Sequence, residues 1–154
     1  MFTRPTARLF VLNADNRTLL FRVEDHDLSD PANPRRPVIF WVTPGGGVET
    51  GETFAEAALR ELWEETRIQP AALGPRVQDR DILLRERGRD ILFRTQFFVV
   101  RVDAADVSLA GMSQQERAGH RDHRWWSLDE LDDTEETVYP EDLAAILRVW
   151  LDFS

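Results

Sequence analysis

The sequence predicts an α/β domain in which a mixed β-sheet lies between helices. Three observations lead to this prediction: apolar segments of strand length recur along the chain, a helical segment follows the third of them, and a second helix closes the sequence. The 154 residues, 42% hydrophobic and 31% charged, are enough for one domain with a proper core. We therefore expect residues 1–154 to form a single domain.

The first part of the chain predicts two paired strands, a loop and a buried strand. Residues 7–12 and 18–23 are apolar and flank the turn-rich residues 13–16, as in a hairpin. Residues 24–37 are polar, contain three prolines and predict a loop. Residues 38–42, Val-Ile-Phe-Trp-Val, predict a short buried strand that runs directly into a Thr-Pro-Gly-Gly-Gly segment.

A helix is predicted after these glycines. Thr53 is its expected N-cap, and Glu56 three residues later completes a capping box. Pro70 and Gly74 end the helical segment. The expected buried stripe, at helical spacing, consists of Ala55, Leu59, Leu62 and Thr66.

The remainder of the chain predicts two strands, a second long loop, a short strand, a helical turn and a closing helix. In chain order these are residues 77–84, 91–102, 103–122, 124–126 and 127–131, and a helix from Pro140. Proline suits the first position of a helix because its missing N–H would have no helical partner there. A sheet with helices before and after its later strands is expected to be covered on both faces.

Charge and missing residue types exclude several classes of function. The net charge of −9, from 19 basic and 28 acidic residues, argues against a nucleic-acid polymer as partner. Every basic residue is arginine, so a Walker A phosphate loop and Schiff-base catalysis are excluded. The absence of cysteine excludes disulfides, thiolate catalysis and cysteine-based zinc sites.

The hydropathy pattern predicts the location of the protein. Residues 1–5 lack the apolar run of a signal peptide, and no apolar stretch is long enough to span a bilayer. We therefore expect a cytoplasmic protein with no membrane partner, and we leave a homodimer open.

The most informative segment places glycines before an acidic helix. It reads Gly46, five residues, Glu52, seven residues, and then Arg60-Glu61-Leu62-Trp63-Glu64-Glu65. This pattern resembles the Nudix box, the signature of a family of MutT-like enzymes that hydrolyse a nucleoside diphosphate linked to another group. Arg67 departs from the pattern, because the family usually has glycine there. The family fold is an α/β/α sandwich, which agrees with the predicted element order.

The acidic residues of this segment predict a metal site. Glu61, Glu64 and Glu65 share one helix face, because an α-helix turns every ~3.6 residues. Three like charges repel one another there, so we expect a cation among them. Mg²⁺ fits as a hard cation that takes oxygen ligands, with Mn²⁺ as a substitute. The alternative is a solvated acidic face on a surface helix.

The resemblance implies a role for each matching residue. Glu64, Glu65 and the backbone carbonyl of Gly45 would be metal ligands. Glu61 would be a metal-neighbouring residue or the general base, a role that varies within the family.

Other residues of the segment would support these ligands. Arg60 would orient the glutamates, and Glu52 would pair with that arginine or approach a metal, two alternatives that the sequence leaves open. Gly46 and Gly47 would let a substrate approach the backbone closely. Arg67 in place of glycine endangers the loop after the helix more than the carboxylates before it.

Weaker candidates lie outside the segment. Glu116 is our choice for a further metal ligand from a downstream loop, with Asp122 as the second choice and a solvated acid as the alternative for each. Arg35 and Arg36 are candidates to grip a phosphate or sugar, although they are also expected as a solvated basic pair. Four aromatic residues are candidates to stack on a base or to fill the core: Phe40, Trp41, Phe97 and Phe98.

The predicted function is metal-dependent hydrolysis of the pyrophosphate bond in a small nucleotide. A glutamate takes the proton of a water that attacks one phosphorus, while the cation neutralises charge. The first substrate class is nucleoside or deoxynucleoside triphosphates, with ADP-sugars and dinucleoside polyphosphates as alternatives. A non-catalytic domain that senses nucleotides is the alternative from another class.

Overall fold

The computed structural model describes residues 2–70, 72–103, 107–108 and 120–152. The strands of the first half are β1 (Phe2–Leu12), β2 (Thr18–Glu24), β3 (Leu28–Ser29), β4 (Ile39–Val42) and β5 (Gly45–Gly47). The strands of the second half are β6 (Arg76–Glu86), β7 (Arg89–Arg101), β8 (His120–Trp126) and β9 (Val138–Tyr139). The helices are α1 (Phe54–Thr66), α3 (Leu128–Asp133) and α4 (Leu143–Asp152).

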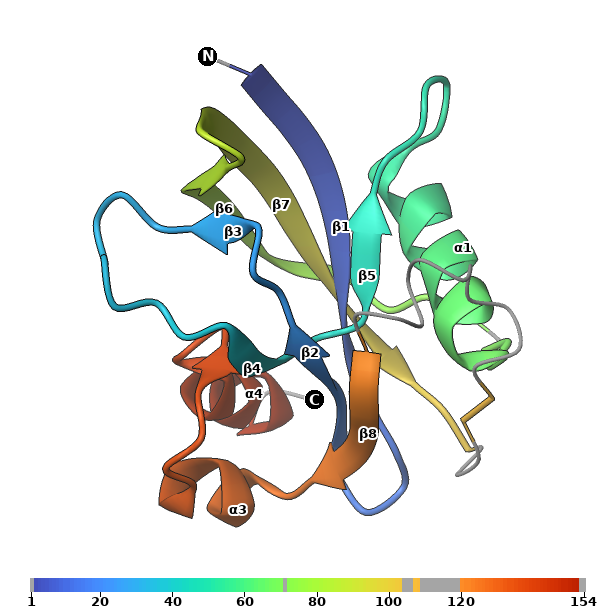
Figure 1. Ribbon diagram of the computed structural model, residues 1–154. Coiled ribbons are helices and arrows are strands. Elements are labelled where there is room, and N and C mark those ends of the chain that lie inside the picture. The colour runs from blue at the N-terminus through green and yellow to red at the C-terminus, as the bar shows by residue number, and fades with distance from the viewer. Residues whose placement is uncertain (1, 71, 104–106, 109–119, 153–154) are drawn as a thin grey trace.

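The strands form one curled, mixed sheet (Figure 1). Its main order is β3-β6-β7-β1-β2-β4-β9, while β5 pairs with β1 and β8 pairs with β2. The pairs β1–β7 and β4–β9 are parallel, and the remaining pairs are antiparallel. The predicted mixed sheet is therefore confirmed.

Helices cover both faces of this sheet, and β1 contributes side chains to the hydrophobic core on each face. Alternate side chains of a strand point to opposite faces. Leu9 packs into a cluster with Leu62 of α1, whereas Phe10 packs into a second cluster with Leu147 of α4. Figure 1 shows α1 on one side of the sheet and α4 on the other. The predicted α/β/α arrangement is confirmed.

Several predicted boundaries are wrong, and long-range strand pairing decided two of them. The predicted loop 24–37 contains β3, which pairs with the end of β6. Strand β8 begins at His120, inside the predicted loop 103–122, because it pairs along β2. Helix α4 begins at Leu143 rather than Pro140, and the Leu143 N–H donates to the Pro140 carbonyl.

In the described residues, no helix has the length and apolar character needed to cross a bilayer.

The buried face of α1 also differs from the predicted stripe. Leu59 is 39% exposed, whereas Leu62 and Thr66 are fully buried as expected. The residues that α1 buries are Ala57, Ala58, Glu61, Leu62, Glu65 and Thr66. The predicted stripe missed four of these positions: Ala57 and Ala58, and also Glu61 and Glu65, which an apolar pattern does not count because they carry carboxylates. The helix therefore presents acidic side chains toward the sheet.

Candidate active site

Local signals define where α1 begins and ends. Thr53 accepts a hydrogen bond from the Glu56 N–H, and the Glu56 side chain accepts one from the Thr53 N–H, so the predicted capping box is confirmed. The helix ends at Arg67, which adopts the left-handed conformation with φ 59° and ψ 22°. Its guanidinium lies 4.8 Å from the centre of the Trp63 ring. This cation–π contact offsets part of the strain of a residue with a side chain at that position.

Helix α1 and the glycine strand β5 meet through two glutamates. Glu61 and Glu65 are only 8% and 3% exposed, although each carries a carboxylate. The Gly45 N–H donates a 2.7 Å hydrogen bond to Glu65 Oε1. At Gly46, an added Cβ would lie 2.5 Å from Glu61 Oε1, so the missing side chain makes room for that carboxylate. The glycines therefore let the backbone approach the acidic helix closely.

Arg60 is the central cation of this segment. Its guanidinium donates to both carboxylate oxygens of Glu52, over 2.8 and 3.0 Å. Nη1 donates to Glu61 Oε1 at 3.0 Å and to Glu64 Oε2 at 3.2 Å. Nη2 donates to the Gly47 carbonyl at 2.8 Å. One arginine thus ties the glycine strand to three glutamates, which is the geometry expected of a residue that orients them.

These contacts shift the pKa values of Glu52 and Arg60. The hydrogen bond from Arg60 lowers the pKa of Glu52 to about 2, and the N–H of Glu49 adds to the shift. The same carboxylate raises the pKa of Arg60 above its ordinary value. Of the two alternatives for Glu52, the structure shows the pairing with arginine. Glu52 therefore stays ionised well below neutral pH.

The donor set fits a hard divalent cation by its chemistry. Glu61, Glu64 and Glu65 offer carboxylate oxygens, and Gly45, whose N–H bonds Glu65, offers a backbone carbonyl, which are the ligand types that Mg²⁺ prefers. Among the described residues, however, no three acidic or histidine side chains already form a group that could hold a metal. Instead, Arg60 donates a hydrogen bond to each of Glu61 and Glu64.

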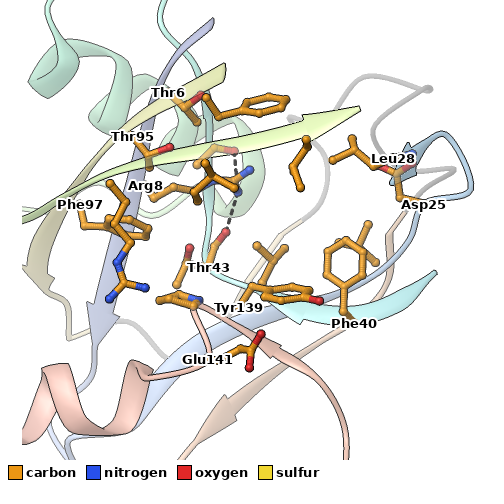
Figure 2. Close-up of a pocket in the computed structure, with 18 of the residues that line it drawn as sticks. Thr6, Arg8, Asp25, Leu28, Phe40, Thr43, Thr95, Phe97, Tyr139 and Glu141 are labelled. Carbon is orange, nitrogen blue, oxygen red and sulfur yellow. Dashed lines mark hydrogen bonds between the residues drawn. The ribbon is translucent and has the colours of Figure 1, made fainter. Parts of the chain in front are cut away.

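A cavity of about 630 Å³ opens beside this segment (Figure 2). Strands β1, β2, β4, β6 and β7 and the residues after β9 line it. Gly45 and Glu65 form part of its wall, so the predicted metal site borders the cavity. Most of its surface is apolar and includes Phe40 and Phe97, while three arginines and five carboxylates also reach it. A space of this size with a mostly apolar surface is typical of a site for a small organic ligand.

The two predicted substrate arginines lie in different places. Arg36 lines the cavity, with its guanidinium 4.9 Å from the Phe40 ring centre and 4.5 Å from that of Tyr139. Arg35 is exposed and lines a separate hollow beside Glu136. The predicted pair is therefore not a unit, because the chain turns here, with the Arg36 N–H bonded to the Asn33 carbonyl, and the two side chains face different surroundings.

The predicted aromatic residues are divided between cavity and core. Phe40 and Phe97 line the cavity, and Phe97 also stacks on Phe10 with ring centres 5.0 Å apart. Trp41 packs edge-on against Trp126 within the core below α4. Phe98 belongs to the core below α1.

The downstream acidic candidates are less informative. Glu116, the predicted additional metal ligand, lies outside the described residues. Asp122, the second choice, is exposed on β8 opposite Arg22 of β2.

Sequence reasoning missed Arg8, which lines the cavity from β1. Its Nη1 donates to the Thr43 carbonyl at 2.8 Å and more weakly to the Gly45 carbonyl at 3.5 Å. Burial lowers the pKa of Arg8, while the charges of Glu65 and Glu61 oppose that shift. The available signal was a single charged residue among residues 7–12, the otherwise apolar segment that predicted the first strand.

Fold and site together define an α/β domain that presents an acidic, arginine-braced helix beside a ligand-sized cavity. A profile of the NUDIX domain matches residues 2–148, and the chain therefore belongs to the NUDIX domain family. Enzymes of this family generally use divalent metals. The resemblance inferred from residues 46–68 is confirmed over nearly the whole chain.

Individual relatives resemble the chain over different lengths. An RNA pyrophosphohydrolase of Roseobacter denitrificans is 36% identical over 67 residues, which are 44% of this chain and 36% of that protein. The match thus spans about a third of the curated relative. The MutT protein of Methanosarcina mazei Go1 has a TM-score of 0.67 at 21% identity, covering 99% of this chain and 95% of that one. The NUDIX domain of Shewanella oneidensis NrtR, solved with ADP ribose, has a TM-score of 0.66 at 15% identity, covering 98% and 90%. At these identities the two structures establish the fold alone.

Proposed function

We propose that this chain hydrolyses the pyrophosphate bond of a nucleoside diphosphate linked to a further group, with nucleoside triphosphates as the first substrate class. One observation carries the proposal: Arg60 ties Glu61 and Glu64 of α1 to the glycine strand, and Glu65 of the same helix borders a cavity of about 630 Å³. Membership in the NUDIX domain family supports the reaction type, and the curated relative is named for pyrophosphate hydrolysis.

The residues divide the work as follows. Glu64, Glu65 and the Gly45 carbonyl would hold Mg²⁺, or Mn²⁺ in its place, and Glu61 would complete the set or take the proton of the attacking water. The bound cation supplies charge neutralisation and Lewis acidity. Arg60 keeps the carboxylates of Glu61 and Glu64 oriented from one side.

The cavity would receive the organic part of the substrate. Its aromatic lining suits a nucleobase, and Arg36 lies at the rings of Phe40 and Tyr139, where it would meet that part of the ligand. A small nucleotide is proposed rather than a nucleic-acid polymer, because the net charge is −9. Residues 1–154 are proposed to act as one domain.

The test is a product assay with Mg²⁺ over nucleoside triphosphates, ADP-sugars, dinucleoside polyphosphates and an RNA with a 5′-triphosphate. We expect Glu65→Gln to lower turnover by about 10²-fold or more while the fold remains intact, because the cation loses a charged ligand. Glu135→Gln is the matched control, since Glu135 is an exposed acid remote from α1 in sequence. Equal turnover in both variants contradicts the ligand assignment. Binding of nucleotides without hydrolysis across the panel favours the sensing alternative.

A further inference from the structure

The cavity wall contains an arginine whose position is set by the backbone of the glycine strand. Arg8 lies on β1 opposite Gly45, in the antiparallel pair that β1 forms with β5. Its Nη1 alone makes the hydrogen bonds to the Thr43 and Gly45 carbonyls (Figure 2). These carbonyls are neutral acceptors, so they anchor the side chain without neutralising its charge.

The rest of the Arg8 guanidinium has unused donor capacity. Arginine carries five N–H donors, and within the described part of the chain no hydrogen bond is made by Nε or Nη2 of Arg8. The other two arginines of the cavity differ. Arg80 bonds the carboxylate of Asp142 at 2.5 Å, and Arg36 lies against two aromatic rings. Arg8 is therefore the cavity arginine best placed to bind an anion.

The carboxylates around the cavity outnumber the arginines, so the positive charge of Arg8 would favour a bound phosphate. The residues that line the cavity include three arginines and five carboxylates, which are Arg8, Arg36, Arg80, Asp25, Asp30, Glu65, Glu141 and Asp142. A phosphate chain entering an acidic cavity is repelled unless a cation lies nearby. Arg8 lies on the same wall as Gly45 and Glu65, where the proposed function places the phosphates.

We propose that Arg8 binds a phosphate oxygen of the substrate, opposite the cation held by the glutamates, through its Nε and Nη2 donors. Guanidinium groups match phosphate oxygens in a bidentate geometry, which a lysine cannot reproduce. The inference rests on the proposed function for the identity of the ligand, but it is tested by binding alone. The proposed phosphate contact thus comes from β1 and not from residues 46–68, the segment that resembles the Nudix box.

The experiment measures the affinity of methylenediphosphonate, a non-hydrolysable diphosphate, in the presence of Mg²⁺ by calorimetry. We expect Arg8→Gln to weaken binding by roughly 10- to 100-fold, since a charge-assisted contact is lost. The affinity of Arg8→Lys should lie between those of the wild type and Arg8→Gln, because lysine keeps the positive charge but cannot donate two parallel hydrogen bonds. Arg101→Gln is the matched control: Arg101 also donates to a backbone carbonyl, that of Asn13, but is exposed and outside the cavity.

Adenosine, which carries no phosphate, separates phosphate binding from a merely structural role. Its affinity should be the same in the wild type and in Arg8→Lys. An unchanged diphosphonate affinity in Arg8→Gln overturns the inference, as does an equal loss for adenosine and diphosphonate in Arg8→Lys. If Arg8→Gln does not fold, Arg8→Lys decides by the same criterion. Loss of diphosphonate binding in a protein that hydrolyses no nucleotide leaves this inference standing and removes the proposed function.

Discussion

Replacing Gly46 by alanine tests the contact between β5 and α1 most directly. A Cβ at this position would lie 2.5 Å from Glu61 Oε1 and 2.6 Å from its carboxylate carbon. Ordinary contacts begin near 3.4 Å, so the carboxylate would have to withdraw by about 0.9 Å. Glu61 is only 8% exposed and accepts a hydrogen bond from Arg60, which leaves it little room to move. Overpacking of this kind costs about 1–3 kcal/mol of unfolding free energy, or a Tm lowered by about 2–12 °C.

Gly47→Ala is the matched control, one residue further along the same strand. Within the described structure, no heavy atom lies within 4 Å of a Cβ added at Gly47. Thermal unfolding should therefore distinguish the two variants. In the product assay, Gly46→Ala should lower kcat by about 10²-fold, because a displacement near 1 Å misplaces a reacting group. The reasoning is refuted if both variants lose the same Tm, or if Gly46→Ala retains the wild-type Tm and kcat.

Two further predictions concern the ends of α1. Because the folded-state pKa of Glu52 is depressed to about 2, its ionised form stabilises the fold fully above about pH 5, and this contribution is lost as the pH falls toward 2. Urea unfolding from about pH 6 to 2 should show a flatter acid limb for Glu52→Gln; parallel limbs would contradict the shift. At the other end, Arg67→Gly should change Tm by less than about 2 °C, because ~1 kcal/mol of relieved strain offsets a lost cation–π contact of similar size. Arg67→Ala loses the contact and keeps the strain, so its Tm should lie about 2–4 °C below that of the glycine variant, and a higher Tm would count against this account.

The sequence by itself predicted the elements whose signals are local. The capping box at Thr53 and Glu56 involves residues three apart, and it forms as expected. Strands β1, β2 and β7 were predicted from their apolar residues, which are apolar because they pack in the core. The acidic segment after Gly46 identified the family, since the spacing of its residues is itself the signature.

The tertiary structure decided what depends on residues distant in the chain. The cavity exists only where β1, β4, β6 and β7 come together, and no local pattern in any one of them encodes its volume. Arg8 gained its place because Thr43 and Gly45, more than 30 residues away, present their carbonyls to it. Folding also separated Arg35 from Arg36, which adjacency in the sequence had joined. Hydrogen bonds and packing across the sheet, rather than local propensity, set these positions, and they become visible only once the chain is folded.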